Sequence, residues 1–486
     1  MKWNPRRLYR EMSPAVRTSV WFTLCNFLQR GTALITTPIF TRLLTTEEYG
    51  ICNIYFSWFE IFVLFTSLKI QYEGLNNGLI RYEEDKDGYA SSALGLIMAL
   101  TLGAAAVYGI FHTWINRITG LSNLLMMLML IQLLFNPPLM LWTNRERFDF
   151  RYRWPVVVTL ISTVLNPTLS VLAVLSTSYR AEARIIAVVS VQCIFGLLCA
   201  ITIFRRGKTF YRRDYWRFAL RFNLPLLFYY LSQSLLNESD RIMINYFEGS
   251  GKAGIYSVAY TAATIMLLLV SAINASFNPW MYRQLKAKRF QEVRRAVLGL
   301  YLLVGGATLG MSAFAPDLIR ILATEEYSQA IWIVPPVSAG VFFIFLYMMF
   351  ANVEMYYDEN KGISKISILC SGANLVLNAI FIPLFGYLAA GWTTLACYLL
   401  LAVLHFILMK RACRRHQVEK KIVPERQLLL ISVAVLAMTF VMLGLYTLGA
   451  FRYVILIAEA VAVLVFRKNL LQMLRRIPKG ADGYEG

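Results

Sequence analysis

Apolar residues in this chain lie in long blocks separated by short polar connections, not in the short alternating runs of a soluble protein. A helix needs about 20 mainly apolar residues to cross the hydrocarbon core of a bilayer. About fourteen blocks approach that length, and the last of them is short. They predict membrane-spanning helices near residues 18–44, 51–70, 91–115, 121–143, 155–178, 184–204, 219–241, 253–278, 295–315, 330–353, 363–383, 387–409, 427–448 and 451–466.

Composition supports this interpretation. Of the 486 residues, 58% are hydrophobic and 16% are charged, whereas a soluble domain is about half apolar and about one quarter charged. Length alone would suggest several soluble domains, but no connection between the blocks is long enough to fold by itself. The fold class expected is therefore an all-α polytopic membrane protein.

The net charge of +20 follows from the distribution of basic residues and needs no nucleic-acid partner. Lys and Arg gather in alternate connections, and such connections usually face the cytoplasm. An even number of spans then places both termini in the cytoplasm. The connection at 81–89 is more acidic than basic, but acidic residues contribute little to orientation. The opposite connections carry only Arg42, Arg117, Arg180, Arg184, Arg241, Lys252, Arg320 and Arg452.

Neither a catalytic centre nor a metal site is indicated. Six of the seven cysteines fall in apolar blocks, no cysteine pair has metal-ligand spacing, and there are three histidines. The string EGSGKAG around Lys252 lacks the first Gly and the final Ser or Thr of a phosphate loop. Asp85-Lys86-Asp87 imitates a sugar-transferase metal pair, but it stands in a short connection. We therefore expect neither an enzyme nor a cofactor, and no cleavable signal peptide.

Charges inside predicted spans are the main candidate site. A charge near the bilayer centre costs about 2.5–3.5 kcal/mol on insertion scales, so it usually faces a partner or an aqueous cavity. Arg30 lies in the middle of the first span and Glu60 near the middle of the second. One interpretation is a structural ion pair between them. The other is a cavity cation for an anionic substrate, with Glu60 holding or releasing Arg30.

Three further groups are candidates, each with a structural alternative. Lys69 and Arg81 continue the second span and could form an inner basic vestibule, or anchor the helix at the interface. Asp240 and Arg241 end the seventh span and could line an outer gate, or cap the helix. His405 could carry a proton, or simply be satisfied by a neighbour. The same two interpretations apply to Glu354.

A faint internal repeat suggests a two-lobe design. The string EEYGICNIYF, with Gly50, opens the second span, and GKAGIYSVAY, with Gly254, opens the eighth. Internal repeats are common in transporters. The expected organisation is a six-helix lobe at 1–215, a second at 216–410, and a final part at 411–486 with a basic loop, two extra spans and a cytoplasmic tail.

Three strings resemble the polysaccharide-biosynthesis flippases, the Wzx-type branch of the MOP superfamily. The first, TTPIFTRLLTTEEYGICNIYFSWFE, joins spans one and two. The second, NLPLLFYYLSQSLLNESDRIMINYFEGSGKAGIYSVAY, joins spans seven and eight. The third is FAPDLIRILATEEYSQA at 314–330. The resemblance covers most of the chain.

The resemblance implies two six-helix bundles around a central cavity, plus two C-terminal helices, in a bacterial inner membrane. It implies a flippase for undecaprenyl-diphosphate-linked oligosaccharide that serves O-antigen, capsule or exopolysaccharide assembly by alternating access. A basic cavity, with Arg30 and Lys69 as members, would bind the diphosphate. Membrane lipids and the polymerase and chain-length proteins of the same pathway are the expected partners, and the coupling ion stays open.

Other classes of membrane protein share some of these features. Multidrug antiporters related to MATE transporters share the fold and offer acidic sites to cationic substrates. Arg30 argues against that class, whereas Glu60 keeps it open. Sugar-chain polymerases and ligases resemble proteins with a large outside loop, and every outside connection here is short.

Overall fold

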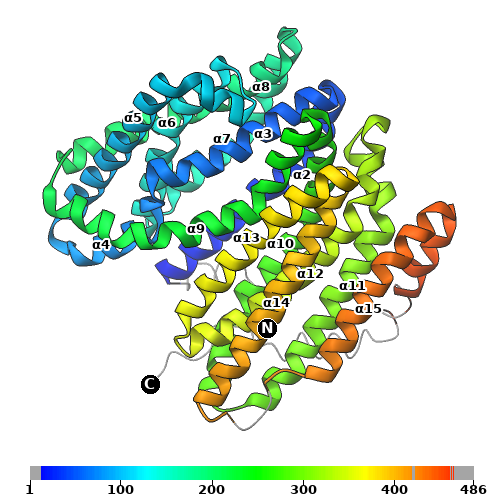
Figure 1. The fold of residues 1–486 in the computed structure, drawn as a ribbon. Helices are drawn as coiled ribbons and strands as arrows, with labels where there is room; N and C mark the ends of the chain where they lie inside the picture. Colours follow the sequence, from blue (N-terminus) through cyan, green and yellow to red (C-terminus); the bar gives the residue numbers. More distant parts are fainter. Residues whose placement is uncertain (1–12, 419–421, 460, 462–463, 465–486) are drawn as a thin grey trace, which may run out of the picture. The chain divides into compact units, whose positions relative to one another are not determined.

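The computed structural model describes residues 13–418, 422–459, 461 and 464. Within them the chain is helical throughout, with no β-strand (Figure 1). It divides into two compact units, residues 1–254 and 255–486. The all-α class is confirmed, whereas the lobe limits at 215 and 410 stay predictions.

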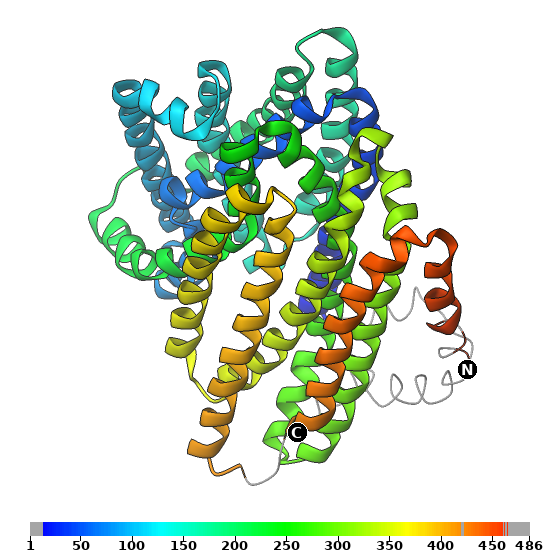
Figure 2. The ribbon, with the colours of Figure 1, turned by 45° about the vertical axis from the view of Figure 1, so that its right-hand side comes forward.

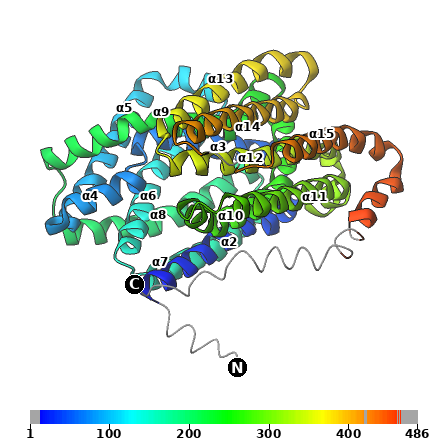
Figure 3. The ribbon, with the colours of Figure 1, turned by 90° about the horizontal axis from the view of Figure 1, so that it is seen from below.

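The first unit contains helices α2 to α9 and the start of α10. Helix α8 packs against both α6 and α7, and α3 packs against α9. Helix α2 lies along α7 (Figure 3). The bounds are α2 Pro14–Leu43, α3 Thr46–Ser67, η1 Ile70–Gly74, α4 Leu75–Arg81, η2 Glu83–Asp85, α5 Lys86–Thr119, α6 Asn123–Phe148, α7 Arg153–Ser176, α8 Arg180–Gly207, α9 Arg213–Glu248 and α10 Ser250–Lys286.

The second unit contains the rest of α10 and the helices that follow. Helix α12 packs against α11, α13, α14 and α15, and Figure 2 shows the long helices of this unit side by side. Its side chains are accordingly buried over most of its length. The bounds are α11 Phe290–Leu322, η3 Glu325–Trp332, α12 Val334–Tyr356, α13 Asn360–Phe385, α14 Ala389–Arg415, α15 Glu425–Thr447 and η4 Gly449–Arg452.

The observed helices coincide with the predicted spans. Among the described residues, 11 helices are long and apolar enough to cross a membrane. Helices α2 and α9 also stand where spans were predicted, but they are more polar than those 11. The predicted span at 451–466 lies partly outside the described residues. The prediction of a polytopic membrane protein is therefore confirmed, and the prediction of about fourteen spans exceeds the number that meets both criteria.

Helix α3 begins at a capping box. The Thr45 hydroxyl accepts from the Glu48 backbone N–H at 3.2 Å, and the Glu48 carboxylate accepts from the Thr45 N–H at 2.9 Å. These two bonds satisfy donors that a helix start leaves without partners. Five residues after the cap, Gly50 meets the start of α10. A Cβ atom on Gly50 would lie 1.8 Å from the Ser250 carbonyl oxygen, and one on Gly254 would lie 2.4 Å from that of Thr46. The two glycines of the repeat thus permit one close backbone contact.

Helix α3 is interrupted inside the first unit. Leu68 and Lys69 both have left-handed backbones, with φ of 49° and 51°, and a π-helical turn, η1, follows. Such backbone is unusual for residues other than glycine. Neighbouring side chains bind the irregular segment: Asn144 donates to the Gln71 carbonyl at 2.7 Å, and Tyr89 donates to that of Gly74 at 2.9 Å. The predicted span at 51–70 therefore ends two or three residues early, at a break held by hydrogen bonds.

The connection between α8 and α9 is fixed to α5. The Ser92 hydroxyl accepts from the Arg212 backbone N–H at 3.1 Å, and the Ser92 carbonyl accepts from the Trp216 indole at 2.9 Å. One turn further along α5, Gly95 faces the connection directly. A Cβ atom there would lie 2.1 Å from the Phe210 carbonyl oxygen, a backbone atom that a side-chain rotation cannot move away.

We predict opposite effects for two alanine substitutions on α5. Gly95→Ala should destabilise the protein by about 1–3 kcal/mol, since overpacking forces the backbone to shift. Gly103→Ala is the matched control, because a Cβ atom there has nothing within 4 Å. It should be neutral or gain up to about 1 kcal/mol from helix propensity. Apparent melting temperatures of the purified proteins in detergent give the comparison, and equal temperatures would contradict the close contact.

Candidate functional site

Two neighbouring cavities lie in the first unit, and polar side chains line both of them. The smaller has a volume of about 220 Å³ and lies among α3, the α3 break, α6 and α8; we call it the amide cavity. Glu60 and Lys69 line it and form an ion pair of 3.6 Å between Oε2 and Nζ. The other lining residues are Phe56, Phe59, Val63, Gln71, Tyr72, Gln132, Asn136, Met140 and Gln192.

Neutral amides dominate the polar wall of the amide cavity. Gln132 donates to Gln192 at 3.0 Å, and Asn136 donates to the same oxygen at 3.2 Å. The Tyr55 hydroxyl in turn donates to Gln132 at 2.7 Å. The buried Gln71 Oε1 accepts no hydrogen bond from the described part of the chain. The wall thus offers fixed donors together with an unused acceptor.

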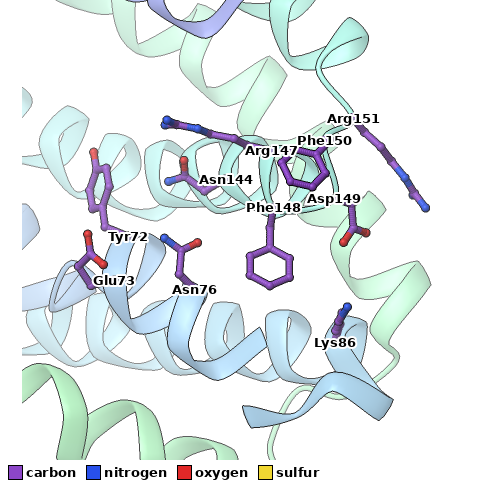
Figure 4. Close-up of a pocket in the computed structure, with 10 residues that line it drawn as sticks. All are labelled: Tyr72, Glu73, Asn76, Lys86, Asn144, Arg147, Phe148, Asp149, Phe150 and Arg151. Carbon is purple, nitrogen blue, oxygen red and sulfur yellow. The ribbon is translucent and has the colours of Figure 1, made fainter. Parts of the chain in front are cut away.

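The larger cavity has a volume of about 990 Å³, and we call it the arginine cavity because Arg147 and Arg151 line it (Figure 4). Tyr72 lines both cavities, and Gln71 and Asn144, one from each, are linked by the hydrogen bond at the α3 break. In Figure 4, Tyr72, Glu73 and Asn76 face a second row of side chains that runs from Asn144 to Arg151. The full lining is Tyr72, Glu73, Asn76, Lys86, Asn144, Arg147, Phe148, Asp149, Phe150 and Arg151.

Positive charge in the arginine cavity is only partly neutralised. Asp149 is bound by Arg145 at 2.6 Å, and Arg145 also binds Asp87 at 2.9 Å. Among the described residues, neither Arg147 nor Arg151 has a carboxylate partner. The Arg147 guanidinium instead lies over an aromatic ring of α2, 5.3 Å from its centroid. Two guanidinium groups are therefore left to bind an anion.

A polar cluster fixes the start of α5, and with it Lys86. Asp85 caps the helix by accepting from the Gly88 N–H at 3.0 Å. The same carboxylate accepts from the Tyr215 hydroxyl at 2.7 Å. Burial and this hydrogen bond raise the pKa of Tyr215 to about 12, so its hydroxyl remains a proton donor at neutral pH. Lys86 then pairs with Glu83 at 3.8 Å, at the edge of the arginine cavity.

The predicted substrate residues have different positions. Lys69 lines the amide cavity, as described. Arg81 ends α4 and lies 5.1 Å from the Phe218 ring centroid. Arg30 is exposed on α2 and lines neither cavity. The partner found for Glu60 is Lys69, whereas the sequence suggested Arg30. The roles of these residues stay predictions.

Asp240 and Arg241 lie on α9, opposite α3. Asp240 is buried. Arg241 binds Glu238 at 2.6 Å, and Glu238 also accepts from the Ser57 hydroxyl of α3 at 2.7 Å. Since Ser57 is one turn before Glu60, this cluster continues the polar side of α3 away from the cavities. Its arrangement is compatible with both predicted roles, a gate and a helix contact.

Glu354 and His405 meet in the second unit. Glu354 is near the end of α12 and His405 is within α14. The His405 Nδ1 lies 2.9 Å from Glu354 Oε2 and 3.1 Å from Oε1, and both side chains are fully buried. Both residues were candidates from the sequence, but their contact was not predicted.

Arg147 and Arg151 were missed as site residues. In the sequence they belong to the dense charged string NRERFDFRYRW between two spans, and they served only to orient the chain. Arg147 lines the cavity because α6 continues to Phe148, about a turn beyond its predicted end, and Arg151 lines it from the connection that follows. The acidic residues interleaved in the string were the available signal, because they pair with some of the arginines and leave others unpaired.

Solved structures of a lipid flippase and of a multidrug transporter share this fold. The lipid II flippase MurJ, in an inward closed conformation, superimposes with a TM-score of 0.67 at 15% identity, over 94% of this chain and 99% of that chain. An inward-facing multidrug resistance transporter of the MATE family gives 0.62 at 12% identity, over 84% and 100%. These likenesses show that the chain has the fold of these two membrane proteins, as the sequence predicted.

The family follows from the sequence. A model of the family described as polysaccharide biosynthesis protein matches residues 15–284, and a MatE model matches 225–381. The chain belongs to the polysaccharide biosynthesis protein family. This confirms the family resemblance noted in the sequence.

Two relatives match by sequence, and neither has a name that states an activity. A protein of the Lsg locus of Haemophilus influenzae is 28% identical over 165 residues, 31% of this chain, and the match spans only 38% of that relative. An uncharacterized membrane protein of Methanocaldococcus jannaschii is 21% identical over 84% of this chain and 86% of its own length.

The Glu60–Lys69 pair distinguishes a structural ion pair from one that a ligand can displace. The two side chains are 48% and 17% exposed, so water reaches both. A double-mutant cycle with Glu60→Gln and Lys69→Met should give a coupling of about 0.2–1 kcal/mol, the range of solvated pairs. Melting of the four proteins in detergent measures it. A coupling of several kcal/mol would instead identify a buried structural pair.

Proposed function

We propose that this transporter moves an undecaprenyl-diphosphate-linked oligosaccharide from the inner to the outer leaflet of a bacterial cytoplasmic membrane. Alternating access is the proposed mechanism, and surface polysaccharide assembly is the proposed purpose. The polymerase and chain-length proteins that consume such a product are the proposed partners.

One observation carries the proposal: two arginines that have no carboxylate partner among the described residues lie beside a cavity lined by amides. Arginine binds phosphate oxygens through two parallel N–H bonds, which suits Arg147 and Arg151 to a diphosphate. The amides of Gln132, Asn136 and Gln192 both donate and accept, which suits sugar hydroxyls. A lipid-linked sugar presents these two chemistries next to each other.

Lys69 connects the two regions in this proposal. It pairs with Glu60 and lies 5.7 Å from the centroid of the Tyr72 ring, which lines both cavities. A diphosphate in the arginine cavity would compete with Glu60 for Lys69. The empty site would then keep its charges neutralised, and the occupied site would free a carboxylate. Arg30 and Arg81 would contribute further positive charge along the route.

The orientation of the chain is part of the proposal and has a direct test. With both termini in the cytoplasm, the connection at 208–212 faces the cytoplasm and the residue before α8 faces outside. In a cysteine-free background, Lys208→Cys should resist a membrane-impermeant thiol reagent in intact cells, and Tyr179→Cys should react. Reaction of Lys208→Cys alone would reverse the orientation and leave the cavities as they are.

Substrate recognition is tested by removing the unpaired arginines. Loss of the gene should accumulate lipid-linked sugar in the host, and the wild-type gene should restore the surface polysaccharide. Arg147→Ala and Arg151→Ala should each reduce flipping about tenfold or more, because a hydrogen bond to a charged group is worth about 1.5–3 kcal/mol. Protein abundance should stay normal. Lipid extraction and mass spectrometry provide the measurement.

Two controls separate the diphosphate site from charge in general. Arg205→Ala removes an exposed arginine at the end of α8 and should transport normally. Arg30→Lys should retain more function than Arg30→Ala if the charge binds the substrate, because lysine keeps the charge without the guanidinium fork. Normal surface polysaccharide in the deletion strain, together with increased sensitivity to cationic drugs, would favour the multidrug antiporter instead.

A further inference from the structure

The Glu354–His405 pair is more than a packing contact, because its hydrogen bonding is incomplete. Both side chains are fully buried, and one ring nitrogen, Nδ1, faces the carboxylate. The other ring nitrogen, Nε2, is buried and has no hydrogen-bond partner among the described residues. A buried polar group left without a partner costs free energy. A histidine selected only for packing would be served better by an apolar residue.

Charge balance determines how many protons the pair holds. With one proton shared, the pair is neutral overall, either as imidazolium and carboxylate or as imidazole and carboxylic acid. Without that proton the net charge is minus one, and with a second proton it is plus one. Burying a net charge in an apolar enclosure is strongly unfavourable. The closed arrangement therefore holds one proton.

Few other charges act on the pair. On α12 the Tyr347 ring centroid lies 5.5 Å from that of His405, and Glu359, just beyond the helix, acts electrostatically on Glu354. Glu359 itself is neutralised by Arg415 at 2.6 Å. Ionisable groups on the packed elements include the buried phenols of Tyr301 on α11 and Tyr398 on α14, exposed Lys365 on α13, and Lys410 of α14, which pairs with Glu425 of α15 at 3.2 Å.

We propose that Glu354 and His405 form a binding site for one proton in the second unit, and that the proton enters and leaves at His405 Nε2. Binding takes one proton from water and brings the pair from a net charge of minus one to zero. Release returns that proton to water when a conformational change opens the enclosure to solvent. The ring nitrogen without a partner is the atom that a water molecule would reach first.

Coupling to transport rests on the proposed function. A conformation that hydrates the pair favours proton release, and one that encloses it favours the bound proton. A proton gradient then biases which conformation is populated, since a ligand shifts an equilibrium by its differential affinity for the two states. One proton would be exchanged in each transport cycle. The carboxylate freed in the first unit on substrate binding, Glu60, is a separate group with its own test.

The proton site can be tested without transport. The chain has three histidines, so a His112→Gln, His416→Gln background labelled with ¹⁵N-histidine reports His405 alone. In lipid nanodiscs its ring nitrogens should show one coupled protonation step, and undecaprenyl diphosphate as a probe should shift its midpoint. Ring signals unchanged from about pH 5 to about pH 8, with and without the probe, would overturn the proposal. Such a result would not affect the diphosphate site.

Coupling is tested in proteoliposomes with undecaprenyl diphosphate bearing a fluorescent N-acetylglucosamine. If one proton moves per cycle, the leaflet ratio of the probe at steady state should change about tenfold per pH unit of imposed gradient. Glu354→Gln and His405→Gln should abolish that dependence. Glu359→Gln is the matched control and should retain it, since it removes a carboxylate near the pair but outside it.

The outcomes of this assay separate the two proposals. Flipping by the wild type that ignores the gradient, or a Glu354→Gln variant that responds like the wild type, overturns the coupled proton site and leaves the flippase standing. Absence of flipping by the wild type contradicts the proposed function, and the nitrogen spectra then decide the proton site alone. Should Glu354→Gln fail to reach the membrane, His405→Gln and the wild-type spectra carry the test.

Discussion

Backbone N–H and C=O groups inside a bilayer have no water to bind, so each must find a partner within the protein. Continuous helices meet this requirement unaided, which is why long helices dominate both units. The α3 break at 68–74 does not, and it survives because Asn144 and Tyr89 supply hydrogen bonds to the interrupted segment. Both cavities of the first unit border this segment, through Lys69, Gln71, Tyr72 and Glu73. The polar site therefore depends on the support given to one irregular stretch.

The two units differ in how far their polar groups are exposed to water. In the first, ion pairs and amides line two cavities, and the paired side chains of Glu60 and Lys69 are partly exposed. In the second, α12 is enclosed by neighbouring helices and carries Glu354 into a dry environment, where a carboxylate keeps its partner. Solvation thus decides which ionic contacts are exchangeable. The proposed flippase would use both kinds, one to bind its substrate and one to stabilise a conformation.

Much of the fold could be predicted from the sequence, because bilayer thickness imposes a length on each apolar block. The helices from α2 to α15 lie where spans were expected, apart from the short α4. The polar connections before α4 and α5 were harder, since η1, α4 and η2 are too short for periodicity to reveal. Lys69 was predicted as a member of an inner basic vestibule, and it lines a cavity. Its pairing with Glu60 depends on two left-handed residues, which no sequence pattern signals.

Arg147 and Arg151 illustrate a second limit. A sequence shows that a connection is basic, but charge bias alone assigns that property to orientation. Which arginines are neutralised depends on the three-dimensional neighbours of Asp87, Glu146 and Asp149. Arg147 and Arg151 can be recognised as lacking a carboxylate partner among the described residues only once those pairs are known. The glycines of the repeat behave in the opposite way, since their spacing was visible in the sequence and their mutual contact gives it a physical reason.

The break in α3 also affects how this segment tolerates changes in chain length. In a continuous helix, inserting or deleting one residue rotates everything beyond it by about 100°, because there are about 3.6 residues per turn. Left-handed Leu68 and Lys69 end that phase relation, and η1 is already a turn that accommodates an additional residue. A one-residue insertion between 68 and 74 can therefore be absorbed locally, while α3 keeps its face toward α9 and α4 keeps its own. Homologous chains of different lengths can align on either side of this point without rotating a helix.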